Sequence, residues 1–148
     1  MSTLSSKEIA RQERMGLLAR ASADQLGALV AALPDYDWLR PPEVGAVMVR
    51  GRVGATGAPF NLGEMTVTRC ALRLSDGRVG HAYVQGRDKA HATRAALVDA
   101  WMQGAEAAQV EADVLAPLRA REAVRRSARA EKAAATKVEF FTMVRGED

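Results

Sequence analysis

The pattern of apolar and polar positions predicts two short helices in the first 34 residues. Ser5 and Ser22 each stand three residues before a Glu or Gln, the spacing of a capping box at a helix start. The first helix is expected to run to about Ala21. In the second, apolar residues recur at helical spacing up to Pro34, which cannot continue a helix: Leu26, Leu29, Val30 and Leu33. The sequence therefore predicts an N-terminal helical pair.

Strand-like segments follow, in which apolar and polar residues alternate with a period of two. Pro41-Pro42 separates the first two segments, because proline cannot donate a hydrogen bond to a neighbouring strand. In the second segment valines alternate with Met48, Arg50 and Arg52, which predicts one covered face and one polar face. The four expected segments are 36–40, 44–53, 65–74 and 79–85.

Asp76-Gly77 lies between the last two segments and is a strong hairpin signal. A two-residue turn would place Leu74 opposite Val79 and Cys70 opposite Tyr83, with Leu72 opposite His81 and Thr68 opposite Gln85. These eight residues would then share one face of the sheet. Because both faces carry polar residues, the pattern leaves open which of them the helices cover.

The period changes to 3.6 after Gly86, and Asp88 is placed to cap a helix that we expect to be the central packing helix. Pro117 suits the first turn of a further helix, which is rich in Arg and Ala. The chain then ends in residues 137–144, KVEFFTMV, whose apolar and β-prone side chains predict a strand-like arm.

Together these elements predict an α+β fold, with a small and mostly antiparallel sheet, helices packed on it, an N-terminal helical pair, long C-terminal helices and a terminal β-arm. The length of 148 residues fits a single domain. We expect residues 137–148 to contact a partner, and we expect the isolated chain to form homo-oligomers through this arm. The candidate subunit-interface residues are Val138, Phe140, Phe141 and Met143.

Composition excludes several classes of protein. Hydrophobic residues make up 48% and charged residues 26% of the chain, as in globular proteins and unlike disordered ones. The sequence has no apolar run of the roughly 20 residues that span a membrane, and its N-terminus is polar. Cys70 is the single cysteine, so it can form neither an internal disulfide nor a Cys-rich metal centre. We expect a cytoplasmic protein without membrane contact.

The net charge of +3 is concentrated in residues 116–135, which hold five Arg and one Lys against two Glu. Such a stretch could bind nucleic acid or form a solvated or partner-facing helix. Glu122 and Glu131 interrupt it, and it has no interleaved aromatic residues for stacking on bases. These features favour the helix, and no nucleic-acid partner is expected.

The segment from Gln85 to His91 is the clearest candidate site, because a strand passes through a glycine into a helix start. Free backbone N–H groups there favour an anion, and Arg87 and Lys89 add positive charge. The alternative is that Asp88 is a structural cap and that the two basic side chains are solvated. A second group, Gly51, Gly54 and Gly57 with Thr56, is either a flexible turn or a weaker anion site.

His81 and His91 are the only histidines, and their spacing does not indicate a metal site, so none is expected. His81 is interpreted as a half-buried strand residue. His91 with Asp88 could instead act as an acid–base pair in an independent small enzyme. Cys70 is interpreted as a core thiol rather than a nucleophile.

Two parts of the chain, residues 54–103 and 138–146, resemble the PhnG family, the G subunits of the bacterial carbon–phosphorus lyase core complex. The most specific segments are Thr68-Arg69, Val84–Lys89 with His91, and Phe140–Gly146.

This resemblance implies a role in phosphonate catabolism. With subunits H, I and L, such a protein would support attack of an alkylphosphonate on the ribose C1′ of MgATP, releasing adenine and forming ribose 1-alkylphosphonate 5-triphosphate. Subunits G, H, I and J form the core complex, and C–P bond cleavage belongs to J. MgATP is then a substrate of the complex, and we predict no cofactor bound by this chain and no activity of the chain alone.

The resemblance supplies no established catalytic residue for this subunit. Our own candidates for contact with an anionic substrate or with another subunit are Gln85, Arg87, Asp88, Lys89, His91 and Arg69.

Overall fold

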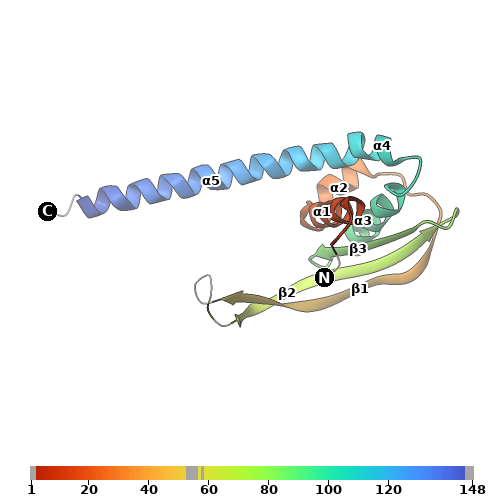
Figure 1. The fold of residues 1–148 in the computed structure, drawn as a ribbon, viewed down its shortest axis with the longest axis horizontal. Coiled ribbons are helices and arrows are strands. Elements are labelled where there is room, and N and C mark those ends of the chain that lie inside the picture. Colours follow the sequence, from red (N-terminus) through yellow and green to blue (C-terminus); the bar gives the residue numbers. More distant parts are fainter. Residues whose placement is uncertain (1–2, 53–56, 58, 146–148) are drawn as a thin grey trace.

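Helices cover one face of a three-stranded antiparallel sheet, and a long C-terminal helix extends beyond them (Figure 1). The computed structural model describes residues 3–52, 57 and 59–145, with only the backbone at 52, 59, 61 and 137–145. The predicted α+β class is confirmed. The elements are α1 (Ser6–Arg20), α2 (Ala23–Leu29), β1 (Tyr36–Arg52), β2 (Pro59–Leu74), β3 (Val79–Gln85), α3 (Lys89–Trp101), α4 (Ala107–Val110), the π-helical segment η1 (Glu111–Leu115) and α5 (Ala116–Arg145).

The predicted N-terminal helical pair is confirmed, with both caps in place. The Glu8 N–H donates to Ser5 Oγ at 3.3 Å while the Ser5 N–H donates to the Glu8 carboxylate at 2.7 Å. At α2 only half of this arrangement forms: Ser22 Oγ accepts the Gln25 N–H at 3.4 Å, and the Gln25 side chain does not bond back to the cap. α2 ends at Leu29, earlier than Pro34 requires, and Leu33 is exposed rather than part of the apolar stripe.

β1 is one continuous strand, so the prediction of two segments divided by prolines is wrong. β1 is an edge strand, and register shifts between Trp38 and Arg40 and between Arg40 and Glu43 accommodate Pro41-Pro42. A proline on the open side of an edge strand removes no hydrogen bond from the sheet.

The far end of the β1–β2 pair forms a two-stranded hairpin arm, residues 47–52 with 59–65, which continues past the end of β3 (Figure 1). Val47 and Val49 are half-buried here, whereas Met48 and Arg50 are exposed. The alternation is confirmed, but the predicted covered face is wrong, because no helix packs over this arm (Figure 1). Of the glycine-rich group at its tip, Gly54 and Thr56 lie outside the described residues.

The β2–β3 hairpin exists, but its register differs by one residue from the prediction. Cys70 lies opposite Ala82, not Tyr83, and Leu72 lies opposite Gly80. The Gly77 N–H donates to the Leu74 carbonyl, and the Leu74 N–H donates to the Arg78 carbonyl, both at 2.9 Å. These bonds, with a φ of +94° at Gly77, make a three-residue loop instead of a two-residue turn.

The observed register separates the two faces that the pattern had mixed, because a shift of one residue exchanges the faces of a strand. The helix-covered face contains Thr68, Cys70, Leu72, Leu74, Gly80, Ala82 and Val84, all of them buried. On the other face His81, Tyr83 and Gln85 are exposed, which corrects the half-buried interpretation of His81.

The central packing role of α3 is confirmed, since nine of its residues are buried. Gly80 lets this helix approach β3 closely: a Cβ at residue 80 would lie 1.9 Å from the Ala96 carbonyl oxygen. Within the described residues, no helix is both long and apolar enough to cross a membrane.

The predicted terminal β-arm is wrong, because α5 continues as a helix through residues 137–144 (Figure 1). Pro117 lies in the first turn of α5, as predicted, and no Gly or Pro follows it before Gly146. Extending an existing helix costs far less than starting one, so the Ala-rich stretch carries the helix into the β-prone segment. The side chains of Val138, Phe140, Phe141 and Met143 lie outside the described part.

Candidate functional site

The junction between β3 and α3 is a fixed turn at Gly86, which has a φ of +93°. The Gly86 N–H donates to the Thr66 carbonyl at 2.9 Å. The Thr68 hydroxyl donates to the Gly86 carbonyl at 2.7 Å. Both polar groups of the glycine backbone are thus bonded to β2, and the positive φ favours glycine at this position.

Asp88 and His91 are each engaged in a structural contact. The Asp88 carboxylate accepts the His91 backbone N–H at 3.0 Å, which confirms that Asp88 caps α3. The His91 ring is buried, and its Nε2–H donates to the Leu18 carbonyl of α1 at 2.9 Å. The imidazole therefore joins α3 to α1.

The remaining candidates at the junction are on the surface. Arg87, Lys89 and Gln85 are exposed. Arg69 lies opposite Tyr83 and makes an exposed ion pair with Glu43 of β1 at 3.6 Å, with half of its side chain in solvent. Arg69 thus lies beside β1 on the sheet face that also carries Tyr83, and it does not line the cleft that Gln85 borders.

Gln85 borders a cleft of about 670 Å³ beside α5, which we call the arginine cleft. Its α5 residues are three or four positions apart and so share one face of the helix. The cleft is lined by Arg20, Gln85, Glu122, Arg125, Arg126 and Arg129. The lining of the cleft therefore includes four arginines and one acidic residue.

Glu122 neutralises only part of this charge. Its Oε1 lies 3.1 Å from Arg20 Nη2 and 2.6 Å from Arg126 Nη2. The hydrogen bond from Arg20 is the main cause that lowers the Glu122 pKa. Within the described side chains, no carboxylate lies within 4.0 Å of the Arg125 or Arg129 guanidinium.

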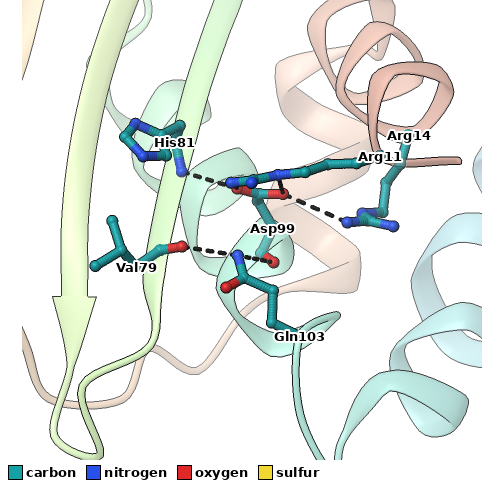
Figure 2. Close-up of polar contacts among 6 residues, drawn as sticks. All are labelled: Arg11, Arg14, Val79, His81, Asp99 and Gln103. Atoms are coloured by element: carbon teal, nitrogen blue, oxygen red, sulfur yellow. Dashed lines mark hydrogen bonds and ion pairs between the residues drawn. The ribbon is translucent and has the colours of Figure 1, made fainter. Parts of the chain in front are cut away.

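A buried carboxylate, Asp99 of α3, was missed by the sequence analysis and organises the polar contacts in Figure 2. Arg11 of α1 donates to it from Nε at 3.1 Å and from Nη2 at 2.8 Å. Arg14 Nη2 lies 3.5 Å away. The sequence signal was an acid within the Ala-rich row of α3, where a lone charge requires a partner.

Asp99 also forms a hydrogen bond with β3, the strand at the open edge of the sheet. It accepts the His81 backbone N–H of β3 at 2.9 Å. One turn later, the Gln103 side-chain amide donates to the Val79 carbonyl at 2.7 Å (Figure 2). Asp99 of α3 and Gln103, which follows the end of this helix, thus bond two of the backbone groups through which an exposed edge strand could pair with another chain.

Cys70 is a core thiol, as predicted. It is buried, and its Sγ–H donates to the Ala92 carbonyl at 3.3 Å. Burial raises the pKa of the Cys70 thiol to about 11. The thiol is therefore protonated at neutral pH. Among the side chains that the structure describes, no group of three or more His, Cys, Asp or Glu residues could hold a metal ion.

Comparison with known proteins identifies a family and a relative of this chain. Residues 9–146 match the family model of the phosphonate metabolism protein PhnG. A protein of Rhizobium meliloti (strain 1021) is 51% identical over 145 residues, which cover 93% of this chain and 90% of the relative. That relative is named alpha-D-ribose 1-methylphosphonate 5-triphosphate synthase subunit PhnG.

Proposed function

This chain belongs to the PhnG family of phosphonate metabolism proteins, and on that basis we propose that it is a subunit of an alpha-D-ribose 1-methylphosphonate 5-triphosphate synthase. The observation that carries the proposal is the 51% identity, which extends over nearly the whole of both chains. The protein then acts in phosphonate catabolism as part of a multi-subunit enzyme.

The proposed reaction joins two anions at the ribose of MgATP. A phosphonate oxygen attacks C1′, a C1′–O bond forms, and the bond from C1′ to adenine breaks with the electron pair leaving on the base. Subunits H, I and L are the proposed partners in this step, and J is the proposed partner for the later C–P bond cleavage. Positive charge on this chain lowers the cost of bringing the two anions together.

We propose that the chain alone does not catalyse the reaction. Three side chains that could act as acids or bases already have structural partners: the buried His91 bonds to the Leu18 carbonyl, the exposed Asp88 caps α3, and the buried Asp99 binds two arginines. The buried thiol of Cys70 is protonated at neutral pH and hence a poor nucleophile.

Among the predicted site residues, the exposed ones remain proposed contacts with substrate or with other subunits. Arg87 and Lys89 lie within four positions of Gln85, which borders the arginine cleft. Asp88 and His91 would maintain the shape of this junction, because their contacts are to backbone groups. Arg69, exposed beside Glu43, is a proposed interface residue.

The test is adenine release from MgATP and methylphosphonate by the chain alone and by the chain co-purified with subunits H, I and L. We expect release only from the assembled complex, reduced by Arg87→Ala or Lys89→Ala. Asp88→Ala is the control for a loss of stability. Removing this helix cap costs about 0.5–2 kcal/mol and should lower the Tm, whereas Arg87→Ala and Lys89→Ala should leave the Tm unchanged. Release by the isolated chain that disappears in His91→Ala would instead establish an independent enzyme.

A further inference from the structure

The arginine cleft has more positive charge than its own contacts use. Four arginines line it and Glu122 is its one carboxylate, so its lining carries a net charge of about +3. Arg20 and Arg126 share Glu122, whereas no described carboxylate is within ion-pair distance of Arg125 or Arg129. Like charges that line one cleft repel one another, and an anion in the cleft would relieve that repulsion.

We propose that the arginine cleft binds the phosphate chain of a triphosphate ligand. This inference rests on the proposed function, since the relative's name specifies a product that carries a 5-triphosphate. A guanidinium binds phosphate through two parallel N–H donors, which makes arginine well suited to phosphate recognition.

The spacing of the arginines fits a chain of phosphates better than a single anion. Arg125 and Arg129 are one helical turn apart, about 6 Å along the axis of α5. Arg20 approaches from α1, and Gln85 adds a neutral polar side chain from β3. Guanidinium groups from two helices can thus bind successive phosphates.

Glu122 would compete with this ligand. In the free chain it links Arg20 of α1 to Arg126 of α5. A phosphate chain must displace or share these contacts, and its own negative charge is repelled by the carboxylate. Removing this charge should therefore strengthen binding, an effect opposite to that of removing an arginine.

The experiment measures binding of inorganic triphosphate to the full-length chain by calorimetry at about 0.15 M salt, where unspecific surface attraction is screened. Arg125→Gln and Arg129→Gln should each weaken binding by about tenfold, since each removes charge-assisted hydrogen bonds. Glu122→Gln should tighten it. Arg121→Gln is the matched control, because Arg121 is exposed on the same helix but does not line the cleft.

Three results would overturn the proposal. The first is no saturable binding of triphosphate. The second is equal weakening by Arg121→Gln and Arg129→Gln, which would indicate attraction to the helix as a whole. The third is unchanged triphosphate binding by Arg125→Gln and Arg129→Gln with loss of co-purification, which would assign the cleft to an acidic partner surface.

Adenine release separates this proposal from the proposed function. If the assembled complex releases adenine but the chain does not bind triphosphate, the cleft assignment alone fails. If the chain binds triphosphate at the cleft but the complex releases no adenine, the proposed function fails and the cleft assignment stands.

Discussion

Replacing Asp99 with alanine should destabilise the protein strongly, because one carboxylate joins α1, α3 and the edge of β3. The Asp99 side chain is fully buried and contacts Arg11, Arg14 and the His81 N–H. Removing one partner of a buried ion pair costs about 3–5 kcal/mol. Arg11 is 39% exposed and regains water when the carboxylate is removed, whereas Arg14 is only 11% exposed. We therefore expect the lower end, about 3 kcal/mol.

That loss corresponds to a fall in Tm of about 6–12 °C for a chain of this length. It would be measured by thermal and urea unfolding followed by circular dichroism. Asp99→Asn should lower the Tm less than Asp99→Ala, since the amide oxygen can still accept the His81 N–H. Asp76→Asn is the control: Asp76 also pairs with an arginine, but its side chain is 54% exposed, so the Tm should change little. If the free energy of unfolding of Asp99→Ala lies within about 1 kcal/mol of the wild-type value, the reasoning that this carboxylate holds the three elements together is refuted.

Two further predictions concern the thiol and the C-terminus. Because burial raises the pKa of Cys70 to about 11, iodoacetamide should modify the unfolded chain much faster than the folded one at pH 8. The contribution of this thiol to the free energy of unfolding should decline as pH rises from about 9 to 11. Equal alkylation rates of the folded and unfolded chains would contradict the burial. Phe140→Ser with Phe141→Ser should abolish co-purification of the other subunits without changing the Tm, whereas a lower Tm of the isolated chain would assign these residues to its own fold.

The β2–β3 hairpin shows why a strand can be predicted while its contacts are not. The sequence identified both strands and the Asp76-Gly77 turn, but the turn type decides which residues face each other. Gly77 occupies the left-handed region as the third loop residue, which moves every pair by one position. Both a two-residue and a three-residue loop accommodate Asp-Gly, so the choice depends on which face the helices cover. That choice was settled by α3, whose close packing against Gly80 requires the observed register.

The prediction of a strand in the C-terminal segment, residues 137–144, was wrong for a different reason. Its composition favours a strand, and this preference is real but depends on context. No Gly or Pro separates it from the Ala-rich part of α5, so the helix has no reason to stop. The preceding 20 residues, rather than the segment itself, determined its backbone.

The arginine cleft could not be predicted from one segment alone, because its residues come from distant parts of the chain. Helical periodicity alone places Glu122, Arg126 and Arg129 on one face of the expected basic helix. The sequence does not show which way that face points, because this is set by the apolar residues that attach the helix to the core. Leu118 is buried, and Glu122 follows it by four residues. Packing of Leu118 therefore turns the arginine-bearing face of the next two turns toward α1 and the end of β3, where Arg20 and Gln85 complete the cleft.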